Sequence, residues 1–130
     1  SKWRFRGGNR INRFWHIDFL EYDEYFSVYL KNEICNRLGD FFEKCSVGRI
    51  YANGQTAGQA GTPHPDDGDM TFLYYPNPEW QYGWQGHLVY LNQENRDQNT
   101  YEPHTIVRYR PNRAVLFPSH IFHHADPPAI

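Results

Sequence analysis

One amphipathic helical segment, followed only by short β-type segments, is the feature that most limits how this chain can fold. From Asp23 to about Lys44, apolar residues recur every three to four positions, which predicts a helix with one apolar face. Asp23 and Glu24 stand at its start, where the helix dipole favours negative charge. No second helical pattern follows, so the chain lacks the helices that parallel strands need as crossovers. The apolar positions are Phe26, Leu30, Ile34, Leu38 and Phe41 or Phe42.

The segments after the helix are rich in β-branched and aromatic residues and are separated by glycine, proline and asparagine, which is typical of strands. Several short strands behind one helix predict a mainly β fold, an antiparallel double sheet closed as a jelly roll with a supporting N-terminal helix. An earlier segment, Phe14 to Phe19, is expected to join the same sheet. The predicted strands are Val47 to Tyr51, Met70 to Tyr75, Gly86 to Leu91, Thr105 to Arg110 and Ala114 to Phe117. The predicted loops are Ala52 to Gly61, Asp66 to Asp69 and Asn92 to Asn99.

Length and composition indicate one folded domain. The 130 residues suffice for one hydrophobic core and are too few for two, so residues 1–130 are expected to form a single domain. A formal net charge of -2 provides no basic surface for nucleic acid, and no apolar run is long enough for a membrane helix. We therefore expect a soluble protein, with the cytoplasm as the favoured compartment. Cys35 and Cys45 have no metal-type spacing, which predicts free thiols. The start at Ser1, without methionine or apolar leader, suggests a trimmed chain or a sequence limited to the observed residues.

A histidine and an aspartate separated by one residue, His64 and Asp66, are the strongest candidates for a chemical site. On an extended backbone, alternate side chains point the same way, so this pair can present two ligands to one metal ion. A later histidine, from the cluster His120, His123 and His124, would complete three ligands on one face of an octahedral ion. This arrangement is typical of non-haem iron(II) oxygenases, in which the opposite face stays open for a cosubstrate and dioxygen.

An ordered series of motifs carries a family resemblance. These motifs are Arg49 to Gly54, Gly61 to Asp66, Met70 to Asn77, Trp80, Gly86 to Leu88, Glu102 and Pro103, and Asn112 to Ser119. Together they resemble the prolyl 4-hydroxylase-like branch of the 2-oxoglutarate and iron(II)-dependent dioxygenases, over about Arg49 to Pro127. The resemblance implies a double-stranded β-helix domain that uses iron(II) and 2-oxoglutarate, with ascorbate as a further cofactor, to hydroxylate a C–H bond.

The resemblance also assigns the metal ligands. His64 and Asp66 match the proximal ligands, and His123 best matches the distal one because of its place ahead of a proline position. His120 and His124 compete for that role. Neighbouring residues on a strand face opposite ways, so His123 and His124 are not expected to bind the same ion.

Four aromatic residues match positions near the cosubstrate and the substrate. Tyr51 and Tyr75 resemble the tyrosines that hydrogen-bond 2-oxoglutarate, although a tyrosine in a strand also serves as packing, and both roles stay open. Trp80 and Trp84 lie in the segment that borders the active-site mouth of related enzymes, where they would contact substrate. Packing at a sheet edge explains the two tryptophans equally well.

One element of the family pattern is missing. Relatives anchor the far carboxylate of 2-oxoglutarate with an arginine or lysine on the strand after the distal histidine, and this chain stops at Ile130. We therefore expect the closing C-terminal strand and its basic residue to lie beyond that position. The alternative anchors are Arg108, Arg110 and Arg113.

The resemblance implies a prolyl residue of a peptide, a free amino acid or another small molecule as substrate, with no nucleic-acid or membrane partner. Asp66 favours hydroxylation, because a halogenase of this fold lacks that carboxylate and leaves room for chloride. Two other functions stay open. One is a non-catalytic metal-binding jelly-roll module, with zinc or the histidines themselves as structural ties, and the other is a metal-dependent hydrolase that works without dioxygen.

Overall fold

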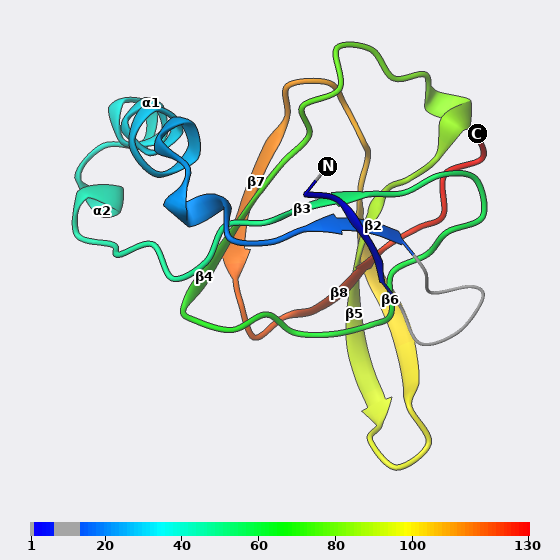
Figure 1. Ribbon diagram of the computed structural model, residues 1–130. Coiled ribbons are helices and arrows are strands. Elements are labelled where there is room, and N and C mark those ends of the chain that lie inside the picture. The colour runs from blue at the N-terminus through cyan, green and yellow to red at the C-terminus, as the bar shows by residue number, and fades with distance from the viewer. Residues whose placement is uncertain (1, 7–13) are drawn as a thin grey trace. The chain divides into compact units, whose positions relative to one another are not determined.

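Strands dominate the chain, and in the described residues, 2–6 and 14–130, they form three sheets in a computed structural model (Figure 1). The described residues group into two compact units: 2–6 with 15–54, and 14 with 55–130. The prediction of a mainly β chain is confirmed.

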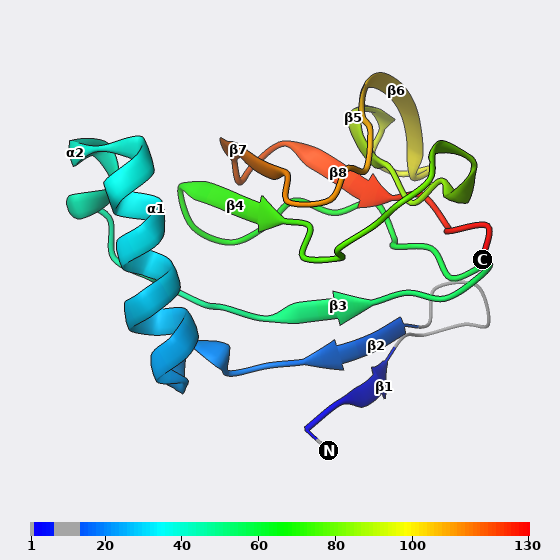
Figure 2. The same cartoon turned by 90° about the horizontal axis from the view of Figure 1, so that it is seen from above.

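The first unit contains a three-stranded sheet. Its strands β1 (Arg4–Arg6), β2 (Phe14–Ile17) and β3 (Ala52–Gly54) lie side by side in that order (Figure 2). β2 and β3 are antiparallel, with Trp15 opposite Gly54. The predicted early strand is confirmed at residues 14–17, but it joins β1 and β3, not the strands that follow β3.

The strand predicted at Val47 to Tyr51 is wrong, because the backbone there has other partners. The Leu20 N–H donates to the carbonyl oxygen of Ile50, and the Ile50 N–H donates to the carboxylate of Glu21. Both hydrogen bonds attach the segment to η1 (Leu20–Tyr22), a 3₁₀ turn. Strand pairing therefore begins only at β3, within the stretch that was predicted to be a loop.

The predicted helix at 23–44 is confirmed as three helical pieces: η2 (Tyr25–Leu30), which is π-helical, α1 (Lys31–Leu38) and α2 (Asp40–Glu43). The carboxylate of Asp23 accepts a hydrogen bond from the Tyr25 N–H at the start. Gly39 separates α1 from α2 with a φ of 71°. No residue of η2 or α1 is fully buried; of the predicted apolar face, Phe26, Leu30, Ile34 and Phe42 are half-buried, and Leu38 and Phe41 are exposed.

The second unit contains the two remaining sheets. β4 (Met70–Tyr74) pairs antiparallel with β7 (Ala114–Pro118), and β5 (Leu88–Asn95) pairs antiparallel with both β6 (Thr100–Val107) and β8 (Phe122–Ala125).

The predicted strands of this unit are confirmed in place, but several bounds differ. β4 and β7 match within a residue, and the loop at 66–69 is confirmed. β5 runs into the predicted loop at 92–99 because the hairpin turns only after Asn95, whose side chain accepts hydrogen bonds from the backbone N–H groups of Asp97 and Gln98. β6 consequently begins at Thr100, and the short β8 was not predicted.

The buried core of the second unit joins its two sheets. Leu88 and Tyr90 of β5 and Phe117 of β7 are buried together, and the rings of Tyr90 and Phe117 meet edge to face with centroids 5.2 Å apart. Leu73, Val107, Val115 and Ile121 pack around them. Two antiparallel sheets that share one core are consistent with a jelly-roll-like fold.

Two other sequence predictions concern the thiols and the membrane. Cys35 and Cys45 are free cysteines, as predicted. In the part of the chain that the structure describes, no helix is both long and apolar enough to cross a membrane.

Candidate metal centre

Two histidines far apart in the sequence lie side by side in the second unit. His64, in the loop before β4, forms an isolated antiparallel bridge with His123 of β8. The His64 N–H donates to the His123 carbonyl at 3.1 Å, and the His123 N–H donates to the His64 carbonyl at 3.0 Å. Their ring centroids are 4.6 Å apart. The backbone therefore fixes both imidazoles on the same side.

Asp66 places its carboxylate between the two rings. Its Oδ1 lies 3.5 Å from Nε2 of His64, and its Oδ2 lies 3.5 Å from Nε2 of His123. The three side chains can each offer a ligand atom, all within 4.8 Å of one another, which makes them a group that could hold a metal ion.

Both imidazoles are held in the orientation that a metal site needs. Nδ1 of His64 lies 2.6 Å from the Thr62 carbonyl oxygen, and Nδ1 of His123 lies 2.9 Å from that of Ile121. A carbonyl can only accept, so each Nδ1 carries a proton. In a neutral ring the lone pair is then on Nε2, which faces Asp66, and in a protonated ring Nε2 can donate to that carboxylate. Two neutral imidazole nitrogens and one carboxylate are a donor set that fits iron(II).

The electrostatics of the group favour a charged carboxylate. Burial raises the pKa of Asp66, but hydrogen bonds from His64 and Thr71 and the nearby imidazoles outweigh it, so the net pKa is below the usual value. The hydrogen bond with Asp66 raises the pKa of His64, whereas burial lowers that of His123.

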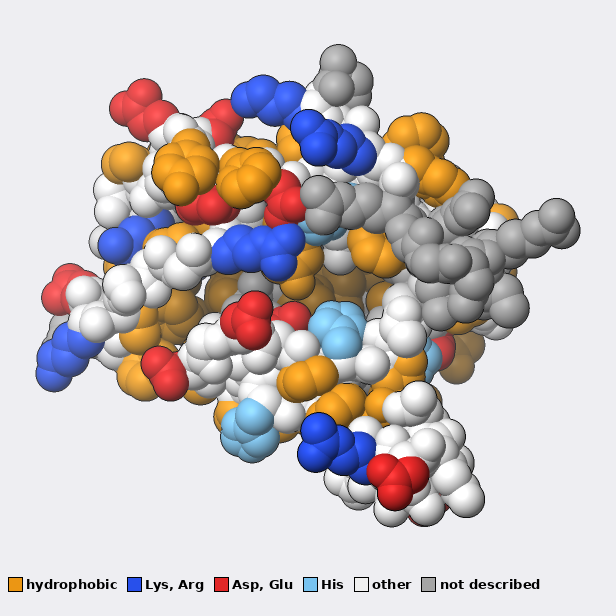
Figure 3. Space-filling view, turned by 60° about the horizontal axis from the view of Figure 1, so that its bottom comes forward, with side chains coloured by type: hydrophobic (Ala, Val, Ile, Leu, Met, Phe, Trp, Pro, Cys, Tyr) orange, Lys and Arg blue, Asp and Glu red, His pale blue; other side chains and the backbone are white. Residues whose placement is uncertain are grey.

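The two histidines differ in access to solvent. The side chain of His64 is 48% exposed and that of His123 only 7%. Imidazole side chains are visible at the surface in the space-filling view (Figure 3). Solvent therefore reaches the group from the side of His64, while His123 forms its inner wall.

Two hydroxyl groups that the sequence analysis did not assign support the carboxylate. Thr71 Oγ1 donates to Asp66 Oδ2 at 2.8 Å and lies 2.9 Å from Oγ of Ser119, which is fully buried. The Asp66 N–H also donates to the Ser119 carbonyl. The only sequence signal was the presence of hydroxyl residues beside the two motifs, which is too common to single them out.

The competing histidines lie outside this group. His120 is an exposed turn residue, and His124 on β8 lies opposite Val89 with its Nε2 3.9 Å from the carboxylate of Asp126. Among the described residues, the structure brings His64 and Asp66 together with His123 only.

The two tyrosines predicted to bind 2-oxoglutarate have different surroundings. Tyr75, just after β4, is buried, and its ring lies 4.1 Å from that of Tyr109. Burial raises its pKa well above the usual value, so its hydroxyl stays protonated. Tyr51 belongs to the first unit, where the guanidinium of Arg49 lies 4.6 Å above its ring and the His16 ring is 5.3 Å away.

The two tryptophans form part of an aromatic cluster. Trp80 stacks on Tyr109 with centroids 4.1 Å apart and meets Trp84 edge to face at 5.5 Å. Its indole N–H donates to the Gln85 carbonyl. Both indoles are half-buried, so each packs on one side and reaches solvent on the other.

The alternative anchors for 2-oxoglutarate are arginines near the β6–β7 connection. Arg113 donates to the Arg108 carbonyl, and the guanidinium of Arg108 lies 4.7 Å above the ring of Tyr82. Arg108 and Arg110 are exposed. In the described part of the chain, no contact links the three guanidinium groups to the group of His64, Asp66 and His123.

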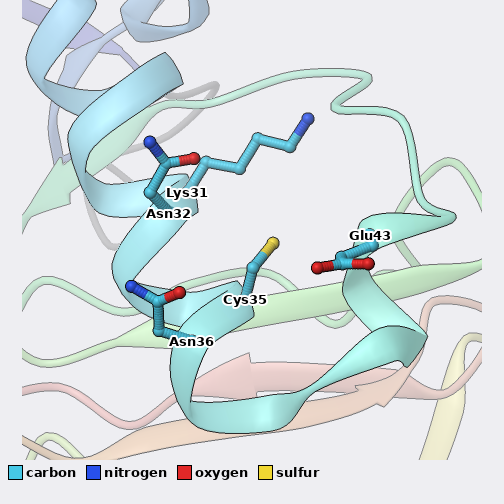
Figure 4. Close-up of a pocket in the computed structure, with 5 residues that line it drawn as sticks. All are labelled: Lys31, Asn32, Cys35, Asn36 and Glu43. Atoms are coloured by element: carbon cyan, nitrogen blue, oxygen red, sulfur yellow. The ribbon is translucent and has the colours of Figure 1, made fainter.

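A separate hollow of about 380 Å³ lies on the helical pieces of the first unit. Figure 4 shows Cys35 of α1 and Glu43 of α2 facing it. Its lining contains none of the predicted site residues; it consists of Lys31, Asn32, Cys35, Asn36 and Glu43.

With the fold and the group of His64, Asp66 and His123 established, the comparison with known families identifies the class. The 2OG-Fe(II) oxygenase superfamily matches residues 9–130, and the chain therefore belongs to that superfamily. Its members use iron(II) and 2-oxoglutarate for oxidation. Iron(II) and 2-oxoglutarate are therefore the cofactors of this chain, and dioxygenase activity is its general function, as its motifs implied. No curated protein and no solved structure is significantly similar to it.

Proposed function

We propose that this chain is an iron(II)- and 2-oxoglutarate-dependent hydroxylase in which His64, Asp66 and His123 bind the iron. The observation that carries the proposal is the meeting of these three side chains, with both Nε2 atoms facing one carboxylate, in a member of the 2OG-Fe(II) oxygenase superfamily. When bound, iron and 2-oxoglutarate supply the chemistry: 2-oxoglutarate is decarboxylated to succinate, and one oxygen atom of dioxygen is inserted into a C–H bond.

The residues of the chain provide geometry for that chemistry. The paired backbone hydrogen bonds between His64 and His123 hold both rings without help from a metal, so the ligands are placed before an ion arrives. The exposed side of His64 gives cosubstrate and substrate a way to the site, and buried His123 keeps water from the inner side.

Tyr75 and Tyr51 are proposed to donate hydrogen bonds to 2-oxoglutarate. For Tyr75, burial and a protonated hydroxyl support this role, because a phenol is a directional donor to a carboxylate. For Tyr51, the support is the match of the Arg49 to Gly54 motif alone.

The finer assignments are part of the same proposal. The ordered motifs support the prolyl 4-hydroxylase-like branch, a jelly-roll fold, and residues 1–130 acting as one oxygenase domain. The half-buried indoles of Trp80 and Trp84 are proposed to contact the substrate, which would be a prolyl residue of a peptide or a free amino acid.

Succinate formation tests the proposal. The chain, supplied with iron(II), ascorbate and 2-oxoglutarate in air, should produce succinate, and His64→Ala should abolish it. His120→Ala is the matched control and should retain turnover, because His120 is exposed and outside the group. Turnover that survives His64→Ala would contradict the metal assignment. Metal binding without succinate would favour the non-catalytic module, and catalysis without dioxygen would favour the hydrolase.

A further inference from the structure

A buried pair of hydroxyls lies directly behind the carboxylate of the candidate metal centre. Thr71 of β4 is half-buried, and Ser119, just after β7, is fully buried. Their oxygens are 2.9 Å apart, and the Thr71 oxygen is 2.8 Å from Oδ2 of Asp66. Neither side chain is a metal ligand or a cosubstrate contact in the proposed function.

Counting protons fixes the direction of the two hydrogen bonds. An ionised carboxylate has no proton, so Thr71 must donate its single hydroxyl proton to Asp66. The Thr71 oxygen then has only acceptor capacity left, so Ser119 must donate to it. The hydrogen bonds therefore run in one direction, from Ser119 through Thr71 to Asp66.

The backbone makes this chain of hydrogen bonds rigid. The carbonyl of Ser119 accepts a hydrogen bond from the Asp66 N–H at 2.8 Å, and the N–H of Ser119 donates to the Asp69 carbonyl at 3.0 Å. Thr71 lies opposite Phe117 in the β4–β7 ladder, and the Phe117 side chain is part of the core. Thr71 thus belongs to a paired strand, and Ser119, in the turn after β7, is held by backbone hydrogen bonds through both its N–H and its carbonyl.

The hydroxyls restrain a side chain that would otherwise rotate. The terminal torsion of an aspartate is broad, so a free carboxylate could turn away from either imidazole. With Oδ2 held by Thr71, Oδ1 stays toward Nε2 of His64 and Oδ2 toward Nε2 of His123. Groups that orient a ligand in this way commonly change metal affinity by about 10- to 100-fold when removed.

We infer that Thr71 and Ser119 are positioning residues for the metal centre, Thr71 by holding the Asp66 carboxylate and Ser119 by acting through Thr71. The inference rests on the proposed role of Asp66 as a ligand. It concerns the affinity of the site for the ion, which can be measured without catalysis.

Cobalt(II) binding to the chain, followed by calorimetry and by visible absorption, tests the inference. Thr71→Val removes the hydroxyl while keeping the shape of the side chain and should weaken cobalt binding about 10- to 100-fold. Thr71→Ser, which restores the hydroxyl, should bind within about threefold of the unmodified chain. Thr100→Val is the matched control, an exposed threonine on β6, and should leave the affinity unchanged.

A double variant shows whether Ser119 acts through Thr71 or whether the two residues affect the metal centre independently. Ser119→Ala should weaken cobalt binding about threefold or more in the unmodified background but have no further effect once Thr71→Val is present. The unfolding midpoint of each metal-free variant shows whether the protein is folded. If Thr71→Val does not fold, the cobalt affinities of Ser119→Ala and Thr71→Ser provide the test.

Three results would overturn the inference: unchanged affinity in folded Thr71→Val or Ser119→Ala, affinity as weak in Thr71→Ser as in Thr71→Val, or additive losses in the double variant. Asp66→Ala distinguishes this failure from failure of the proposed function. If Asp66→Ala abolishes cobalt binding while Thr71→Val does not weaken it, the inference alone is wrong. If Asp66→Ala binds cobalt normally, Asp66 is not a ligand and both are wrong.

Discussion

Asp66 is the residue at which the contacts of the candidate metal centre converge. Its two oxygens face two different imidazoles, one of them also accepts from Thr71, and its backbone N–H is bonded to Ser119. The position of its carboxylate therefore depends on the length of the side chain as well as on its charge.

Lengthening the side chain of Asp66 should lower turnover nearly as much as removing its carboxylate. Asp66→Ala should lower 2-oxoglutarate turnover by at least about 100-fold, and Asp66→Glu should retain only a little activity because the extra methylene displaces the carboxylate. Succinate formation under iron(II) saturation measures the turnover of both variants. Full activity in either variant would count against ligation by Asp66.

The hydroxyl of Tyr75 should matter for the cosubstrate and not for the metal. Tyr75→Phe keeps the packing against Tyr109 but removes the donor, so the KM for 2-oxoglutarate should rise about tenfold while iron(II) affinity changes little. Steady-state kinetics and a metal titration separate the two effects. An unchanged KM would assign Tyr75 to packing alone.

For single residues, the sequence predicts the candidate metal ligands better than the residues that orient them. His64 and Asp66 could be singled out because their spacing on an extended backbone has a chemical meaning. The choice of His123 over His124 came from the resemblance and agrees with the group that the structure assembles. Thr71 and Ser119 could not be found, because their roles depend on a contact between residues 48 positions apart.

Short elements depend on partners that a local pattern does not contain. β8 has four residues and follows a turn, so its pairing with β5 is visible only in the folded chain. The segment before β3 looked like a strand but instead bonds to η1, through a backbone carbonyl and the carboxylate of Glu21. The long, periodic helical segment was predicted reliably because its signal repeats over several turns.

The break between α1 and α2 depends on a backbone conformation that favours glycine. Gly39 has φ 71° and ψ -161°, a region essentially restricted to glycine, so Gly39→Ala should lower the free energy of unfolding by about 1–3 kcal/mol. No atom lies within 4 Å of the added methyl group, so the cost is backbone strain and not a clash. Gly48→Ala, which has the same open space but no positive φ, should change the free energy by about 0.5 kcal/mol or less in urea unfolding. Equal effects at the two glycines would contradict the strain argument.

An ion pair connects the end of β2 with the residues before β3. The guanidinium of Arg49 donates to Asp18, and His16 lies 3.0 Å from the same carboxylate, so the pKa of Asp18 is lowered to about 2. Because the folded pKa is below the unfolded value of roughly 3.9, the stabilisation is present above that pH and is lost as the pH falls toward 2. The difference in unfolding free energy between the unmodified chain and Asp18→Asn should therefore shrink between about pH 4 and pH 2. Urea unfolding at a series of pH values measures it, and a difference independent of pH would contradict the argument.

For the whole molecule, the family match and the assembled group support each other. The superfamily match covers residues 9–130, and the group in the second unit has a donor set that suits iron(II). The mainly β character was predictable because one helix followed by short strands leaves few architectures. The substrate was not predictable, because aromatic residues such as Trp80 and Trp84 are compatible with packing as well as with substrate contact.

X-ray absorption at the iron edge of the anaerobic, iron(II)-loaded chain tests the central claim most directly. We predict a shell of nitrogen and oxygen ligands with scattering from two imidazoles, falling to one imidazole in His123→Ala and remaining at two in His124→Ala, because His124 lies outside the group. Sulfur scattering, or two imidazoles in the His123→Ala variant, would contradict the assignment of His64, Asp66 and His123 as the iron ligands.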